Sequence, residues 1–314
     1  MSEILNLDSK ESVITLVGFL GAGKTTLLKY LEHAISANGG SPYIILNDYE
    51  NAQLDAQQFA DQIKNDRIKS LSGSCVCCTG LHVLREYVND IPERKGGVTL
   101  IEANGTTDAV SLAGFLGTGL KDRFLPPVQF SVVDVVNWQG RGEHNELEAN
   151  QIQLSSLIVL THLENASVDR IAEVKASVRS INAKAKLVRI EEIDISTLAA
   201  FRPVDNTVEK IDHLKTHWAS CSVSLPVFPN RNCIDILCSK IPASILRVKA
   251  CVRIQGVEGF TYFERTPDGK LTIRPLYGIP PMGPTLLTVG LGSDTVFLNG
   301  IIEETLLEIS LVDE

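Results

Sequence analysis

The stretch GFLGAGKTT, Gly18 to Thr26, fits the pattern G-x-x-x-x-G-K-[ST], with Gly18, Gly23, Lys24 and Thr25 at the fixed positions. It follows the apolar run SVITLV (12–17) and opens an amphipathic stretch that begins KTTLLKYLEH. A glycine-rich turn between a buried strand and a helix lets backbone N–H groups converge on phosphate oxygens. A glycine-rich turn without a ligand is the alternative, but it does not explain why the lysine and the threonine are also in place. The stretch therefore predicts a nucleoside triphosphate site.

Side chains in this loop have separate expected tasks. Lys24 is expected to reach the β- and γ-phosphates, and the hydroxyl of Thr25 to ligate Mg²⁺. The whole set of residues predicted to hold the phosphates is Gly18, Gly21, Ala22, Gly23, Lys24, Thr25 and Thr26.

Further apolar runs alternate with longer amphipathic ones over the first 200 or so residues. Their near-continuous Val, Ile and Leu content is typical of strands in a parallel sheet that is covered on both faces. Alternation of strands and helices predicts an α/β fold, a doubly wound, mostly parallel sheet of the P-loop NTPase type. The expected strands are PYIILN (42–47), VTLIEA (98–103), QFSVVDVV (129–136) and SSLIVL (155–160).

The pattern changes around residues 200–216, where FRPVDNTVEK (201–210) is polar and contains proline, as linkers do. We therefore predict a nucleotide-binding domain over residues 1–205 and a smaller α+β domain over residues 206–314. The second domain contains short apolar runs such as ILRVKACVRIQ (245–255) and the helical pattern NRNCIDILCSKIP (230–242).

Composition limits the partners and the compartment. The chain has 314 residues and a formal net charge of −9, and no Lys/Arg cluster stands out, which argues against nucleic acid as a partner. No apolar run approaches the roughly 18 residues that a membrane-spanning helix needs. The opening MSEILNLDSKES has no positive region ahead of an apolar one, so no signal peptide is predicted. We expect a cytoplasmic protein that contacts no membrane.

Three of the seven cysteines, Cys75, Cys77 and Cys78, lie within SGSCVCCTG (72–80). Thiolates are soft ligands, and three of them with one further donor make a tetrahedral Zn²⁺ site. Cu(I) binding and a redox role are alternatives, and so is a role as small apolar core residues. His82 is nearby, but a lone histidine is more often a surface or core residue, so it is not predicted as the fourth ligand.

The P-loop followed by Cys-x-Cys-Cys resembles the CobW family of metal-handling P-loop GTPases. IILNDYENAQLD (44–55) is similar to the family's switch I segment, although Glu50 stands where the family has glycine. LIEANGTTD (100–108) is similar to the family's Glu-x-x-Gly, matched by Glu102 and Gly105, and Ser74 replaces the glycine that precedes the family's thiols.

The resemblance implies a GTPase that binds GTP, Mg²⁺ and Zn²⁺ and delivers the zinc, or a related divalent metal, to a client metalloprotein. It implies that Lys24 and Glu102 are catalytic and that Asp55 and Gly105 contact the nucleotide. Cys75, Cys77 and Cys78 are implied as the zinc ligands. A nucleotide-dependent homodimer rests on the resemblance alone.

The segment LTHLENAS, Leu160 to Ser167, departs from the family at the position of the guanine-reading Asn-Lys-x-Asp. Thr161, His162 and Glu164 stand there instead, so these three are the predicted base-contacting residues. Glu164 keeps a carboxylate, but its side chain is longer than that of aspartate by one methylene. By analogy with base readout, displacing the pair of hydrogen bonds between this carboxylate and guanine forfeits discrimination of about 1–3 kcal/mol. We therefore expect a weakened guanine preference and tolerance of ATP.

Two other functions compete with the metallochaperone. A small-molecule P-loop kinase would leave the thiols unexplained. A non-hydrolysing, base-promiscuous module that senses thiols or metal is favoured by the altered segment at 161–164 and opposed by the intact Lys24, Thr25 and Glu102.

Overall fold

The fold was analysed in a computed structural model that describes residues 10–47, 67–70, 80–204, 220–266, 269–276, 280, 283–290 and 293–312. These residues form two compact units, here called unit 1 (described residues 10–204) and unit 2 (described residues 220–312). The domain boundary predicted between residues 205 and 206 lies outside the described residues, and it stays a prediction.

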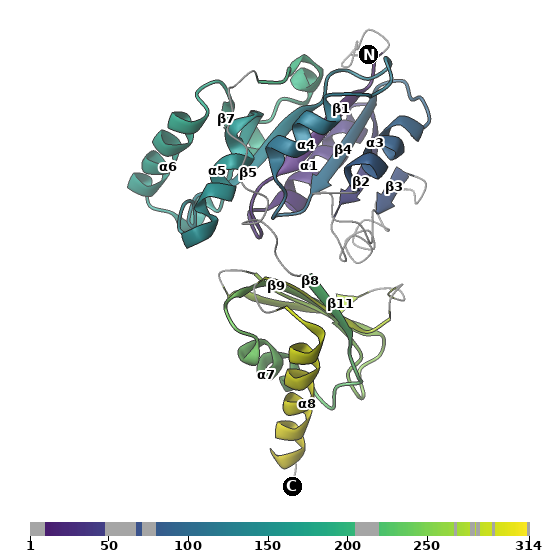
Figure 1. Cartoon of the computed structure of the whole chain (residues 1–314), viewed down its shortest axis with the longest axis vertical. Coiled ribbons are helices and arrows are strands. Elements are labelled where there is room, and N and C mark those ends of the chain that lie inside the picture. Colours follow the sequence, from purple (N-terminus) through teal and green to yellow (C-terminus); the bar gives the residue numbers. More distant parts are fainter. Residues whose placement is uncertain are drawn as a thin grey trace. The chain divides into compact units, whose positions relative to one another are not determined.

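Unit 1 is built on one parallel sheet with β1 at its centre (Figure 1). The strand order is β3-β2-β4-β1-β5-β6-β7, and every neighbouring pair is parallel. Because β4 and β5 flank β1, the segments that follow the carboxyl ends of these three strands meet at one edge of the sheet. The strands are β1 (Ser12–Val17), β2 (Ser41–Asn47), β3 (Ile68–Ser70), β4 (Gly97–Ala103), β5 (Val128–Asp134), β6 (Ser155–Thr161) and β7 (Lys186–Arg189).

Helices cover both faces of this sheet, as Figure 1 shows. Successive side chains of a strand point to opposite faces. Val13 and Val17 of β1 therefore share a face, where they join the cluster that contains Leu84 of α3 and Leu112 of α4. The helices of unit 1 are α1 (Lys24–Ala37), α3 (Gly80–Asp90), α4 (Ala109–Leu116), α5 (Asn145–Gln153) and α6 (Val168–Ile181), with short 3-10 helices η2 (Gly142–His144), η3 (Leu163–Asn165), η4 (Ile190–Glu192) and η5 (Ile195–Ala200).

The predicted α/β fold is confirmed, and the expected strands match the observed ones to within a residue or two at each end. The run QFSVVDVV (129–136) ends earlier than predicted, because β5 stops at Asp134. The Asp134 carboxylate accepts hydrogen bonds from the backbone N–H groups of Val136 (3.0 Å) and Asn137 (3.2 Å), and this turns the chain.

Unit 2 is an antiparallel sheet with the order β11-β10-β9-β12-β8 and two helices packed on it. Leu237 of α7 and Leu298 of α8 share a buried cluster with Val248 of β9 and Leu286 of β12, and Figure 1 shows both helices on one side of the sheet. The predicted α+β character is thus confirmed. The elements are β8 (Ser220–Ser224), α7 (Asn232–Lys240), β9 (Ile245–Val252), β10 (Phe260–Arg265), β11 (Leu271–Leu276), β12 (Thr285–Gly290) and α8 (Thr295–Val312).

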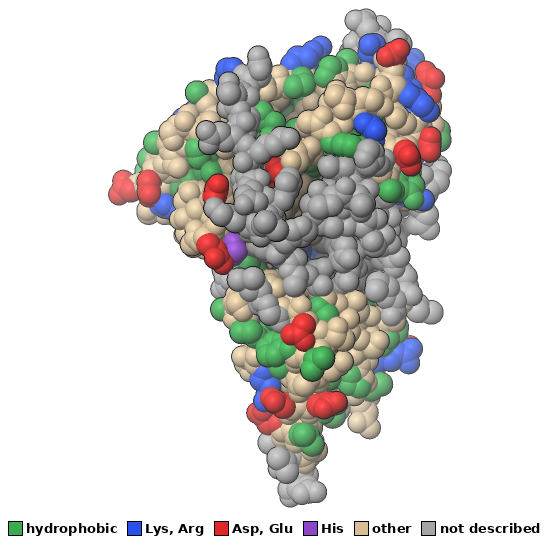
Figure 2. Space-filling view, viewed as in Figure 1, with side chains coloured by type: hydrophobic (Ala, Val, Ile, Leu, Met, Phe, Trp, Pro, Cys, Tyr) green, Lys and Arg blue, Asp and Glu red, His purple; other side chains and the backbone are tan. Residues whose placement is uncertain are grey.

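Charged side chains are spread over the surface shown in Figure 2, and acidic ones lie over the part of unit 2 where α8 runs. Lys240 of α7 pairs with two carboxylates of α8, Glu304 at 3.7 Å and Glu308 at 3.0 Å. Among the described helices, none has both the length and the apolar character that crossing a membrane requires.

Candidate nucleotide site

The P-loop follows β1 and has a backbone that suits glycine at its fixed positions. Gly18 has φ +143° and Gly23 has φ +101°, and a Cβ on Gly18 would lie 2.5 Å from the carbonyl oxygen of Val132. Gly23 is the residue from which α1 begins. Gly21 also has a positive φ (79°), Ala22 is buried, and Thr26 is exposed in the first turn of α1.

Lys24, Thr25 and Glu102 lie together at this edge of the sheet. The Lys24 ammonium is buried and donates to the carbonyl oxygens of Gly18 (2.9 Å) and Phe19 (3.2 Å). The Thr25 hydroxyl donates to Oε1 of Glu102 at 2.8 Å. Glu102 reaches this position because β4 pairs with β1 in a register that places Glu102 beside Leu16.

Gly105, in the turn after β4, lies against the P-loop. A Cβ on Gly105 would come within 2.7 Å of the backbone nitrogen of Leu20. The fully buried amide of Gln151 on α5 holds this turn, because its Nε2 donates to the carbonyl oxygens of Gly105 (2.9 Å) and Thr107 (3.2 Å). The turn that follows β4, three residues after Glu102, is therefore anchored on α5 and lies against the P-loop.

The segment Thr161 to Glu164, predicted to contact the base, lies at the end of β6. The Thr161 hydroxyl is within hydrogen-bond distance of the carbonyl oxygens of Ala22 (2.8 Å) and Val133 (3.1 Å). His162 has φ 57°, and its Nε2 lies 3.3 Å from the carbonyl oxygen of Gly21. Glu164 is exposed in η3 and accepts from Nδ2 of Asn165 at 3.1 Å. Two of these three side chains thus contact the P-loop, and the third faces solvent.

A buried polar network lies behind the P-loop residue Phe19, and the sequence did not reveal it. The guanidinium of Arg141 stands 4.7 Å over the Phe19 ring and pairs with Asp134 (3.2 Å) and with Glu148 (3.7 Å). Burial raises the pKa of Glu148 to about 7, against the opposing effects of the Gln139 backbone N–H and of Arg141. The signal that could have pointed to this place is Asp134, a carboxylate inside the otherwise apolar end of the predicted strand 129–136.

Some predicted site residues lie outside the described residues: Asp55 and the thiols Cys75, Cys77 and Cys78. Their assignments stay predictions. Within the described ranges, no group of three or more His, Cys, Asp or Glu side chains is arranged to hold a metal ion.

The parallel sheet with β1 at its centre and the glycine loop that leads into α1 define unit 1 as a P-loop nucleotide-binding domain of the NTPase type. The family model described as "CobW/HypB/UreG, nucleotide-binding domain" matches residues 12–189. The chain belongs to this family, as the resemblance noted from its sequence implied.

Relatives with curated names are similar over part of their length. Zinc-regulated GTPase metalloprotein activator 1 of Dictyostelium discoideum is 25% identical over 218 residues, which covers 57% of this chain and 46% of that protein. Zinc chaperone YjiA of Escherichia coli (strain K12) is 27% identical over 192 residues, with 59% and 58% covered. The chain therefore spans about half the length of the curated relatives it matches. The crystal structure of Zn(II)-bound YjiA GTPase from E. coli is 18% identical, covers 94% of this chain and 99% of that one, and has a TM-score of 0.42.

Proposed function

We propose that the protein binds and hydrolyses GTP and acts as a metallochaperone, which binds Zn²⁺ through Cys75, Cys77 and Cys78 and passes it to a client metalloprotein. Family membership and the names of the relatives support this proposal. The observation that carries it furthest is the hydrogen bond of 2.8 Å between Thr25 and Glu102, which joins the P-loop to a carboxylate.

The P-loop fits a magnesium nucleotide by its shape and its donor groups. Gly18 and Gly23 have positive φ values, a conformation that glycine adopts readily, and turns of this kind direct backbone N–H groups at phosphate oxygens. A hydroxyl has one proton and two lone pairs. Because Thr25 gives its proton to Glu102, its lone pairs stay available to Mg²⁺. Bound Mg²⁺ would supply positive charge that neutralises the β- and γ-phosphates.

Each residue of the site then has a task in hydrolysis. Lys24, which donates to two loop carbonyls, would turn its ammonium to the phosphate oxygens. Glu102 accepts the hydrogen bond of the Thr25 hydroxyl and, in this proposal, would orient an attacking water. The backbone at Gly105 would change position when the γ-phosphate binds or leaves, because it already packs against Leu20 of the P-loop. Asp55 would join the site from the switch segment.

Zinc is the cargo in this proposal, and the thiols come shortly before α3 in the sequence. Nucleotide state and zinc affinity would then influence each other, and thermodynamic linkage requires that the influence be reciprocal. A nucleotide-dependent homodimer and the cytoplasm as the compartment remain parts of the proposal.

A second candidate is a base-promiscuous nucleotide-binding module that does not hydrolyse. The specific observation in its favour is that Thr161 and His162 contact the P-loop carbonyls of Ala22 and Gly21, which leaves the exposed Glu164 as the base-reading group. A carboxylate that lacks the Asn and Lys of the Asn-Lys-x-Asp motif discriminates guanine from adenine less strongly.

The test titrates the reduced full-length protein with GTP and with ATP in Mg²⁺, with and without one equivalent of Zn²⁺, and records phosphate release. We expect slow GTP hydrolysis, a GTP affinity that Zn²⁺ shifts, and a modest preference over ATP. Glu102→Gln should lower the hydrolysis rate at least about tenfold while GTP still binds.

Cys77→Ala should remove the effect of Zn²⁺, whereas the control Cys221→Ala, which removes a thiol buried in unit 2, should retain it. Unchanged zinc affinity in Cys77→Ala would show that the thiol assignment is wrong. Equal binding of GTP and ATP without phosphate release would favour the second candidate.

A further inference from the structure

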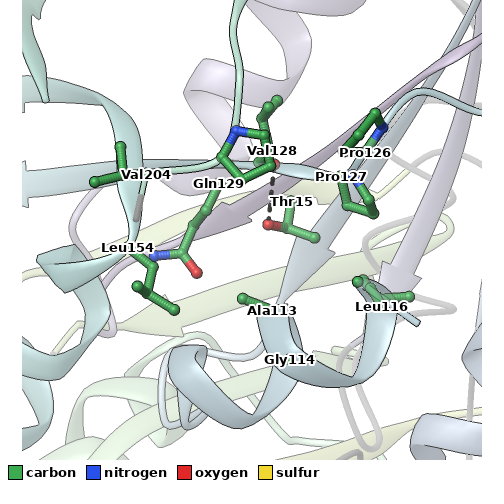
Figure 3. A pocket seen from close by; sticks show the side chains of 12 residues that line it. Thr15, Ala113, Gly114, Leu116, Pro126, Pro127, Val128, Gln129, Leu154 and Val204 are labelled. Atoms are coloured by element: carbon green, nitrogen blue, oxygen red, sulfur yellow. Dashed lines mark hydrogen bonds between the residues drawn. The ribbon is translucent and has the colours of Figure 1, made fainter. Parts of the chain in front are cut away.

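Unit 1 contains a cavity of about 340 Å³ at the opposite end of the sheet from the P-loop. It is formed where β5 begins, whereas the P-loop follows the carboxyl end of the neighbouring parallel strand β1. Its walls come from β1, β5, the last turn of α4 and two proline-containing segments (Figure 3). The residues that the argument uses are Thr15, Ala113, Leu116, Gln129 and Leu154.

The cavity is lined mainly by apolar groups, and among the residues that the structure describes no charged side chain lines it. Thr15 has used its proton, because its hydroxyl donates to the Val128 carbonyl at 3.3 Å. An ionised ligand would lose its hydration here without gaining an ion pair. The volume is at the low end of the roughly 300–1,000 Å³ typical of small-molecule pockets. The cavity therefore suits a compact, uncharged molecule.

Gln129 lines the cavity and has one buried side-chain oxygen just behind this lining. The residue is 3% exposed, and its Nε2 donates to the Gln151 carbonyl (3.0 Å) and to Oγ of Ser155 (2.9 Å). Within the part of the chain that the structure describes, Oε1 of Gln129 has no hydrogen-bond partner. In Figure 3 this oxygen points toward Ala113, and the nitrogen lies on the side of Leu154.

The chemistry of the neighbours fixes this orientation of the amide. Gln151 presents a backbone carbonyl, which accepts and cannot donate. Exchanging the oxygen and nitrogen of Gln129 would set two acceptors against each other. A buried acceptor without a partner is unfavourable, and a donor brought by a ligand would remove that penalty.

We propose that this cavity is a binding site for a compact apolar molecule that carries one hydrogen-bond donor. The ligand displaces the atoms that cover Oε1 of Gln129 and gives its donor to that oxygen. The apolar body would lie against Leu116, Leu154 and Ala113. This site does not depend on the proposed nucleotide function.

Direct contacts connect the cavity to the nucleotide site. Gln129 donates to the backbone of Gln151, whose side chain holds the carbonyl oxygens of Gly105 and Thr107. The helix α4 begins just after this turn, at its cap Asp108, and ends in the cavity wall at Leu116. A ligand that shifts either element would alter the turn that touches the P-loop, so occupancy of the cavity should be linked to nucleotide affinity. This linkage, unlike the cavity site itself, rests on the proposed function.

The first experiment uses the full-length, nucleotide-free protein and two probes of nearly equal shape, indole, which has an N–H donor, and indene, which has none. Binding is followed by ligand-observed NMR. Indole should bind saturably and roughly threefold to tenfold more tightly than indene. Gln129→Met should remove this difference, because methionine keeps the length of the side chain and lacks the acceptor.

A second variant tests the location in case Gln129→Met fails to fold. Ala113→Leu places a larger side chain in the cavity wall and should abolish indole binding, whereas the same change at the exposed Ala183 should leave it intact. The proposal is overturned if indole does not bind saturably, if indole and indene bind equally, or if Ala113→Leu binds indole as the wild type does.

The linkage is read by titrating GTP with and without saturating indole. We expect the dissociation constant of GTP to change at least about threefold in the wild type and to stay constant in Ala113→Leu. An unchanged constant in the wild type would overturn the linkage. If GTP does not bind at all, the proposed function fails, while the indole experiment still decides the cavity site.

Discussion

Gly105 lies in the turn before α4, and Gly114 lies within α4. A methyl group added to each would meet different surroundings. At Gly105 it would come within 2.7 Å of the Leu20 backbone, whereas at Gly114 nothing lies within 4 Å. Gly105→Ala must therefore displace the P-loop, and we expect at least about a tenfold loss of GTP affinity. Gly114→Ala, the matched control, should bind GTP normally and raise stability by up to about 1 kcal/mol, because alanine favours a helix. Calorimetric titration and thermal unfolding measure both. Normal GTP binding by Gly105→Ala would show that this close approach does not matter for the site.

Single residues also show how far the sequence predicted the site. The motif at 18–26 was predicted from its own pattern, and Glu102 was implied by the resemblance to the family's Glu-x-x-Gly. Thr25 does contact Glu102, because β1 and β4 are parallel and bring their carboxyl ends to one edge. The contacts of Thr161 with Ala22 and of Arg141 with Phe19 were not predicted. They depend on the register of β5 and β6 and on a turn after Asp134, which no periodicity encodes.

Asp108 links the element α4 to the loop of the nucleotide site. Its Oδ1 accepts from the N–H groups of Val110 and Ser111, both at 3.0 Å, and so caps the helix. Asp108→Ala should lower the free energy of unfolding by about 1–2 kcal/mol, and Asp108→Asn, which keeps an acceptor oxygen, should lower it less. Asp194→Ala, at the exposed cap of η5, is the control and should have the smaller effect of the two alanine changes.

Urea denaturation measures the free energy of unfolding of all three variants. A loss at Asp194 as large as that at Asp108 would contradict the assignment.

The polar network between β5 and α5 should make the stability of unit 1 depend on pH. Burial raises the pKa of Glu148 from 4.5 to about 7, so the folded state holds a proton that the unfolded chain releases between these values. The stability that this proton provides is present below about pH 4.5 and is lost as the pH rises through 7. Relative to Glu148→Gln, the wild type should therefore lose on the order of 1–3 kcal/mol between about pH 5 and about pH 8.

Fluorescence can report this change from unit 1 alone. Trp138 is buried there, and its Nε1 donates to Ser177. Since the chain has two tryptophans, a Trp218→Phe background leaves Trp138 as the only one. Denaturation of both proteins in that background gives the difference at each pH. If the difference in stability between the wild type and Glu148→Gln does not change over this pH range, the pKa of Glu148 is not raised in the folded state.

Among the elements, those at the end of unit 2 were not predicted. The strand β12 is a short run buried at every position, and such a run does not distinguish a strand from a buried helix segment. In α8 the buried residues Leu298, Ile301, Ile302 and Ile309 form one stripe, but Val296 is 84% and Leu307 63% exposed. These exposed apolar side chains, together with Gly300 inside the helix, hide the amphipathic pattern.

At the scale of the whole molecule, the seven cysteines divide into two sets that a single experiment separates. Cys221, Cys233, Cys238 and Cys251 are buried in unit 2, and burial raises the pKa of Cys238 to about 12 and also raises that of Cys251. A neutral buried thiol reacts slowly, because the thiolate is the nucleophile. We therefore expect a thiol-specific reagent such as Ellman's reagent to modify these four slowly in the native protein and all seven cysteines in denaturant.

Any fast-reacting thiols should then be Cys75, Cys77 and Cys78, and one equivalent of Zn²⁺ should slow them, because a coordinated thiolate is not free to attack. The variant Cys77→Ala should lose this protection by zinc, and Cys221→Ala should keep it. Peptide mapping of the modified protein identifies which cysteines react first. Fast modification of Cys233 or Cys238 would contradict the packing of α7 on its sheet, since both thiols lie in that core. If the three clustered thiols react fast and Zn²⁺ does not slow them, they do not bind the metal. The zinc step would then be removed from the proposed function.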